Sequence, residues 1–258
     1  MTAPYILVFA LLGLLVSGFL SAIAIQWDTT FQSVNPQAYA SNKQTKQRFF
    51  GLILIIKKIM SGINQRKIKP SLAWRYALGE LITTVLFAHA AYAIGWQLEL
   101  IAVLFFICIL VIIVQTDLTD MIIPNKVVAA GVIGAVMIRL FVHPLPLLHY
   151  GIAALVGSGA LLLIAVIGSW ILKKETMGGG DIKLYVFIGL ILGVKLTLLS
   201  LFLASLFGLI GGLALIATGA QARGKTIPFG PYIALGALAA YYWGNGLIEW
   251  YLSLLSFS

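Results

Sequence analysis

The chain has 258 residues, of which 61% are hydrophobic and 10% charged, and it carries a formal net charge of +9. So little charge excludes an ordinary soluble domain and indicates an all-α, polytopic membrane protein. The single cysteine, Cys108, excludes an intrachain disulfide and a multi-cysteine zinc site.

About eight membrane spans are predicted from apolar stretches near the length that a bilayer requires. They cover residues 4–26, 74–96, 99–116, 126–142, 147–172, 182–194, 196–218 and 227–243, and seven or nine spans would also fit. All 17 basic residues except Arg139 and Lys195 lie in or beside the alternate connections. By the positive-inside rule those connections face the cytoplasm, so the positive charge indicates membrane orientation and no nucleic-acid partner. The segment 244–258 could lie along the interface.

One larger cytoplasmic loop, residues 27–73, separates the first two spans. Its apolar stretch 49–56 is too short to cross a bilayer, and its basic flanks favour an interfacial amphipathic helix. The expected partners of the loop are anionic lipid headgroups or an acidic protein, and the alternative is that its charge serves membrane orientation and solubility alone. We divide the chain into N-terminal membrane helices with this loop, 1–96, and a membrane-embedded core, 97–258.

Three of the eight acidic residues lie at predicted cytoplasmic helix ends. Asp117 and Asp120 follow the third span in "QTDLTDMIIPNK", and Asp181 begins the sixth after "MGGG". Two carboxylates held close in a partly dehydrated site share a proton, so one can activate water while the other polarises a peptide carbonyl. Interfacial capping or anchoring is the alternative role for these residues.

Five segments, in order along the chain, resemble the type IV prepilin peptidases, a GxGD family of membrane aspartic peptidases. They are "LLGLLVSGFLSA" in the first span, "WRYALGELIT" at 74–83, "DLTDMIIPN" from Asp117, "MGGGDIKL" around Asp181 and "IPFGPYIALGA" at 227–237. The resemblance implies an enzyme that removes the basic leader peptide of type IV prepilins or pseudopilins, in pilus assembly, protein secretion or competence. It also implies a multi-pass protein of the cytoplasmic membrane with its active site at the cytoplasmic face.

Carried over onto this sequence, the catalytic pair of the family is Asp117 and Asp181. Asp120 lies one helical turn beyond Asp117 and is the rival for the first role. Asp117 ranks above it because its spacing to Pro124 matches the motif.

Four further residues are candidates for supporting roles. Gly178 and Gly180 would leave clearance for a substrate strand or a neighbouring helix. Lys183 could hold a substrate carbonyl, tune the aspartates or reach the interface as an ordinary anchoring lysine. Glu80 is an acid within a span, which makes it a functional hypothesis, although a position at the headgroup level beside Arg75 would explain it equally.

Many members of the family carry zinc-binding cysteine pairs in the first cytoplasmic loop and methylate the new N-terminus with S-adenosylmethionine. Residues 27–73 contain no cysteine. We therefore expect no zinc and no cofactor for the peptidase activity, and S-adenosylmethionine only if a methyltransferase activity is retained. The oligomeric state stays open. The alternative function is a small proton-coupled secondary transporter, although transporters place coupling acids near the bilayer midplane.

Overall fold

The computed structural model describes residues 2–25, 70–174, 177–218 and 227–256. These residues form helices joined by short turns, with no strand among them, which confirms the all-α prediction. The helices are α1 (Thr2–Ile25), α5 (Pro70–Ile94), α6 (Glu99–Asp120), α7 (Asn125–Phe141), α8 (Leu147–Leu172), α9 (Gly179–Leu192), α10 (Val194–Ala217) and α11 (Gly230–Ser256). The predicted interfacial helix within 27–73 lies outside the described residues.

Five of the described helices are long and apolar enough to cross a membrane. The qualifying stretches are Pro4–Ser21, Ala77–Ile94, Glu99–Asp120, Leu147–Leu172 and Val194–Ala217. By contrast, α9 has 14 residues, which gives a length of only about 21 Å. The multi-pass architecture is therefore confirmed, and the number of eight spans stays a prediction.

The third predicted span is longer than expected. We placed Asp117 and Asp120 after it, but α6 continues to Asp120 and ends at Met121, which has a left-handed backbone (φ 54°). Polar residues end the apolar stretch without ending the helix, and the Thr119 hydroxyl finds its partner within the helix, at the carbonyl of Gln115, 2.6 Å away. Both aspartates are thus helical residues.

The chain divides into two compact units, Met1–Ile122 and Ile123–Ser258. In the first unit, α1 packs along α5, and α6 contacts both. Gly13 permits a close approach here, because a Cβ atom at this position would lie 2.8 Å from Cβ of Phe87 on α5. Our functional division at 96/97 stays a prediction.

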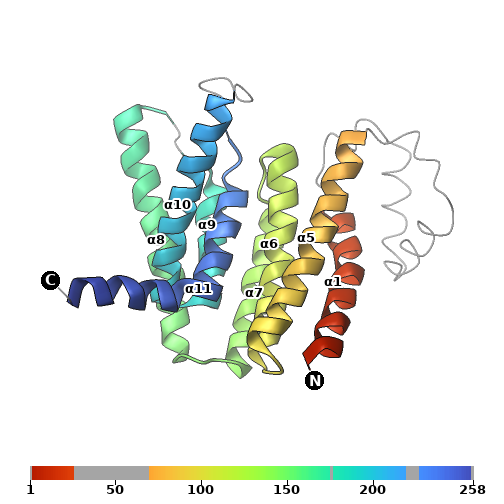
Figure 1. Ribbon diagram of the computed structural model, residues 1–258. Helices are drawn as coiled ribbons and strands as arrows, with labels where there is room; N and C mark the ends of the chain where they lie inside the picture. The colour runs from red at the N-terminus through yellow and green to blue at the C-terminus, as the bar shows by residue number, and fades with distance from the viewer. Residues whose placement is uncertain (1, 26–69, 175–176, 219–226, 257–258) are drawn as a thin grey trace. The chain divides into compact units, whose positions relative to one another are not determined.

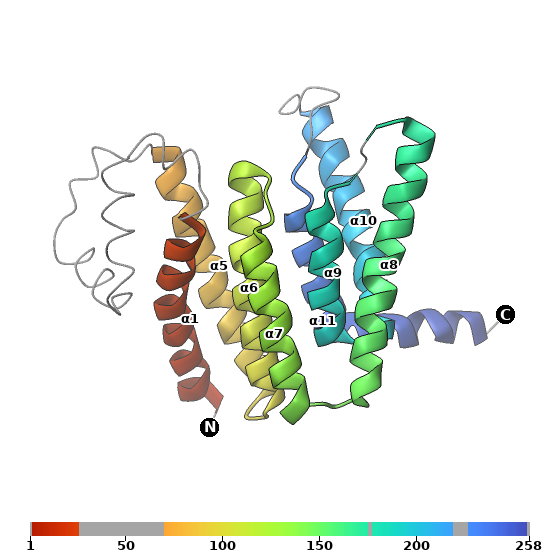
Figure 2. The same ribbon diagram turned by 180° about the vertical axis from the view of Figure 1, so that it is seen from behind.

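In the second unit, α9 is the central helix. It contacts α7, α8, α10 and α11 (Figure 2). Leu184, Tyr185, Phe187 and Ile188 on α9 are all fully buried, and burial on several faces is typical of a core helix. Asp181 therefore lies on the helix that packs against all four other helices of this unit.

Helix α11 has no break after residue 243. It continues to Ser256, and its last part turns and runs across the direction of the other helices in its unit (Figures 1 and 2). Gly244 and Gly246 lie within this continuous helix, and glycines are common where helices bend. An interfacial position for 244–258 stays a prediction.

Candidate active site

Asp181 lies in the first turn of α9. Gly178 is the N-cap, Gly179 and Gly180 are already helical, and the Asp181 backbone N–H donates to the carbonyl of Gly178 at 3.2 Å. Its side chain is 9% exposed. The positive end of the helix dipole favours a carboxylate at this position. The glycine run therefore starts a helix instead of interrupting one.

The three glycines before Asp181 have different surroundings. A Cβ atom on Gly180 would lie 2.9 Å from Cβ of Ile123, a distance that real Cβ contacts essentially never show. One on Gly179 would meet no described atom within 4 Å, and one on Gly178 would lie 3.8 Å from Oδ2 of Asp181. Gly180 thus lets the segment before α7 lie directly against the start of α9.

Lys183 is exposed and donates a hydrogen bond from Nζ to Oδ1 of Asn125 at 3.0 Å. Asn125 is the first residue of α7 and follows Pro124 of the first aspartate motif. This bond joins the two motifs within the second unit. The predicted roles of Lys183 toward a substrate or the aspartates stay predictions.

Asp117 lies in the last turn of α6, in the first unit, and is 5% exposed. Its backbone carbonyl accepts the N–H of Met121 at 3.0 Å, which closes the helix end. Asp120 is half-buried one turn later, and Glu80 on α5 is half-buried. The structure gives Asp117 and Asp181 in different units, so their pairing stays a prediction.

A buried polar contact two residues before Asp117 was not predicted from the sequence. Gln115 is 8% exposed. Its Nε2 donates to Oγ of Ser21 on α1 at 3.4 Å, and its Oε1 has no hydrogen-bond partner among the described residues. The amide occupies the space left by Gly79 on α5, where a Cβ atom would lie 2.2 Å from Nε2. In the motif "WRYALGELIT", the glycine therefore gives room to this glutamine.

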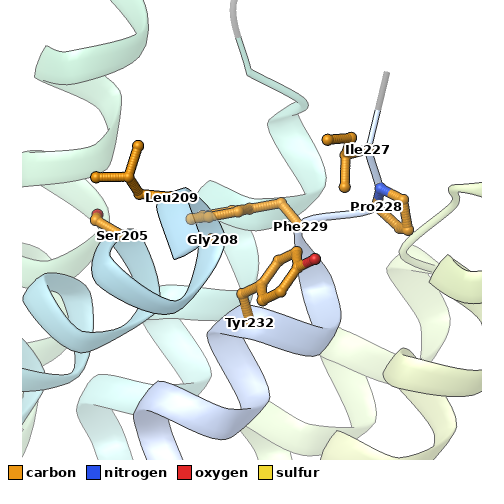
Figure 3. Close-up of a pocket in the computed structure, with 7 residues that line it drawn as sticks. All are labelled: Ser205, Gly208, Leu209, Ile227, Pro228, Phe229 and Tyr232. Carbon is orange, nitrogen blue, oxygen red and sulfur yellow. The ribbon is translucent and has the colours of Figure 1, made fainter. Parts of the chain in front are cut away.

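The "IPFGPYIALGA" segment packs its aromatic residues onto glycines of α10. A Cβ atom would lie 2.9 Å from Phe229 if added to Gly208 and 2.5 Å from Tyr232 if added to Gly211. Figure 3 shows the Phe229 side chain extending from the start of α11 toward α10. A cavity of about 320 Å³ lies here, lined by Ser205, Gly208, Leu209, Ile227, Pro228, Phe229 and Tyr232. These contacts join the last helix to its neighbour.

The residues that the structure describes contain no group of three or more His, Cys, Asp or Glu side chains that could hold a metal ion. Cys108 is a half-buried free thiol in the middle of α6.

Comparison with known proteins identifies related chains. Residues 104–213 match the type IV leader peptidase family. The chain is 36% identical over 184 residues to a prepilin leader peptidase/N-methyltransferase of Bacillus subtilis, covering 71% of this chain and 72% of that relative. A relative of the same name from Aeromonas salmonicida is 32% identical over 192 residues, covering 74% of this chain and 65% of the relative. A third relative of the same name, from Pseudomonas aeruginosa, is 26% identical over 287 residues, covering 98% of this chain and 95% of the relative. No solved structure matches the chain.

Proposed function

Because this chain belongs to the type IV leader peptidase family and is a prepilin peptidase, we propose that Asp117 and Asp181 together catalyse removal of the prepilin leader. The resemblance read from the sequence is confirmed at the level of the family. The chain is a multi-pass protein of the cytoplasmic membrane. The observation that carries the proposal is that both motif aspartates are buried, at 5% and 9% exposed, at the ends of helices.

The proposed chemistry is acid–base catalysis by two carboxylates. One is ionised and takes a proton from the attacking water, while the other is protonated and polarises the scissile carbonyl oxygen. The shortness of the connection supports this pairing, since only five residues separate Asp117 from Ile123, which lies against Gly180. Asp120 is half-buried, whereas Asp117 is buried, and we therefore assign Asp120 a secondary role.

We place the active site at the cytoplasmic face, because the basic residues concentrate in the connections adjoining Asp117 and Asp181. The substrate there is a basic leader followed by an apolar helix of a prepilin or pseudopilin. The leader is more favourably held by lipid headgroups or an acidic surface than by the basic loop 27–73, since like charges repel.

Cleavage alone is proposed for this chain, and zinc has no part in it. The curated relatives are named peptidase/N-methyltransferases, but residues 27–73 here contain no cysteine. Mass spectrometry of the mature N-terminus, after cleavage in the presence of S-adenosylmethionine, tests this directly. A mature N-terminus heavier by one methyl group would show that the protein also has methyltransferase activity.

The central test is a prepilin cleavage assay on membranes containing Asp117→Asn, Asp181→Asn or Asp120→Asn. We expect the first two variants to accumulate in the membrane but to lose cleavage, and Asp120→Asn to keep most of it. Normal cleavage by Asp181→Asn would overturn the mechanism. A transporter would instead give no cleavage even with the wild-type protein and would move protons across sealed vesicles without prepilin.

A further inference from the structure

The last part of α11, residues 244–256, leaves the other helices of its unit and runs across their direction (Figures 1 and 2). Gly244 marks the point of departure, because it is buried against α10. A Cβ atom on this glycine would lie 2.6 Å from Cδ2 of Leu196 and 3.1 Å from Cδ2 of Leu199. Each described residue after Gly244 is exposed except Ile248, which is half-buried. The described helices of the unit therefore leave this segment largely uncovered.

The segment has an apolar side and a polar side. Residues that recur at intervals of three and four share one face of a helix, and residues two apart lie about half a turn from each other. By these intervals the polar set is Asn245, Glu249, Ser253 and Ser256, and the apolar set is Leu247, Trp250, Tyr251 and Leu254, with Leu252 at the border. The side chains of the apolar set are 40–62% exposed. Residues 244–256 thus form an amphipathic helix whose apolar face is covered by no described helix.

The surface of the bilayer is the cover that fits this face. An amphipathic helix with Trp and Leu on its apolar side lies in the plane of the membrane interface, which agrees with the transverse direction of the segment. Trp250 and Tyr251 are of the residue types that are enriched at this level. A contiguous apolar face of this kind is not typical of a surface that meets water alone.

The level at which the segment departs also fits. Gly244 packs against the beginning of α10, which is one of the membrane-spanning stretches and starts at Val194. Lys195, in the first turn of α10, is exposed, and lysine side chains near span ends extend to the headgroups. The opposite end of α10 adjoins the basic connection 219–226, which the positive-inside rule assigns to the cytoplasm. The departure is therefore at the extracytoplasmic boundary.

We propose that residues 244–256 are an in-plane helix that binds the extracytoplasmic surface of the membrane, with the apolar set among the acyl chains and the polar set toward water. Glu249 is the one charged residue of this segment. Binding therefore rests on apolar contact and not on attraction to anionic headgroups, unlike the expected binding of the basic loop 27–73. The interaction surface of the protein thus extends beyond its membrane-spanning helices.

The test uses nitroxide spin labels on the full chain in vesicles of zwitterionic lipid. Cys108→Ala removes the native thiol, so that each variant carries one labelled cysteine. The labelled variants are Leu247→Cys, Glu249→Cys, Tyr251→Cys and Ser253→Cys. Collision rates are measured with oxygen, which concentrates among acyl chains, and with a nickel chelate, which stays in water. We expect oxygen collisions to exceed nickel collisions at Leu247 and Tyr251, and the ratio to reverse at Glu249 and Ser253.

The two polar positions are matched controls, because all four residues are exposed and each polar one lies two residues from an apolar one. The same pattern should persist in vesicles of anionic lipid at high salt, since the segment has no basic residue. Frequent nickel collisions at all four positions would place the segment in water. Infrequent collisions with both reagents at Leu247 and Tyr251 would mean that a second copy or another protein covers the apolar set. Either result would overturn the inference, as would loss of the pattern at high salt.

Discussion

Lys183 and Asn125 join the first turns of α9 and α7 through a hydrogen bond of 3.0 Å between Nζ and Oδ1. At the other end of the same two helices, the guanidinium of Arg139 on α7 donates to the carbonyl of Ile191 on α9 at 2.6 Å. The two helices are therefore parallel and connected at both ends. Because Asp181 lies in the first turn of α9, these contacts determine where its carboxylate is held within the second unit.

Asn125→Ala should lower the rate of prepilin cleavage about fivefold, since it removes an exposed hydrogen bond worth roughly 1 kcal/mol. Lys183→Met should have a similar effect, and the double variant should be no worse than either single one. Asn125→Asp keeps the acceptor and should retain cleavage. The measurement is the initial rate of leader removal in membranes with matched amounts of enzyme. A defect in Lys183→Met without one in Asn125→Ala would mean that the lysine acts directly on the substrate.

Gly180→Val and Gly179→Val place the same side chain at adjacent positions of one helical turn, so their intrinsic helix propensities cancel. Only the first collides with Ile123, at 2.9 Å from its Cβ atom. Overpacking of this kind costs about 1–3 kcal/mol, so Gly180→Val should lose at least about fivefold in cleavage rate while Gly179→Val stays near wild type.

A second substitution makes the glycine prediction specific. Ile123→Gly removes the Cβ atom that Gly180→Val would meet at 2.9 Å, so the double variant should recover part of the lost cleavage. Equal losses in the two valine variants, with no recovery in the double variant, would indicate that the glycines give clearance to the substrate and not to the segment before α7.

The positions of the helices could largely be predicted from hydropathy. The stretch 147–172 coincides with α8, and 126–142 differs from α7 by one residue at each end. Hydropathy failed at the end of α6, because it reports where the apolar residues stop. A helix can continue beyond that point, because polar side chains can find partners within it, as the Thr119 hydroxyl does at the carbonyl of Gln115. Helix ends near the site were thus the least predictable features.

The motifs indicated the candidate site residues but not the residues that these contact. Gly79 and Gly180 are both motif glycines, yet one accommodates a glutamine side chain and the other a neighbouring segment. Gln115 carries no sequence signal of its own, since an amide side chain in an apolar helix is ordinary. Its importance depends on which polar groups face it, and this is decided by tertiary packing.

Arg139 is the basic residue whose role the charge pattern missed. It is 3% exposed, donates to the carbonyls of Leu190, Ile191 and Val142, and lies 4.6 Å from the ring centre of Tyr150. Helix-end carbonyls of α9 have no intrahelical donors, so the guanidinium satisfies them and complements the negative end of the helix dipole.

Arg139→Met should therefore destabilise the protein by about 3 kcal/mol, because it leaves buried carbonyls without donors. The matched control is Lys195→Met, which removes the other basic residue that lies away from the predicted cytoplasmic connections but is exposed. That change should stay within about 0.5 kcal/mol. Unfolding midpoints in detergent, measured on both variants under identical conditions, provide the comparison. Equal unfolding midpoints for the two variants would show that Arg139 does not stabilise α9. The contact between the C-terminal ends of α7 and α9 would then have no part in positioning Asp181.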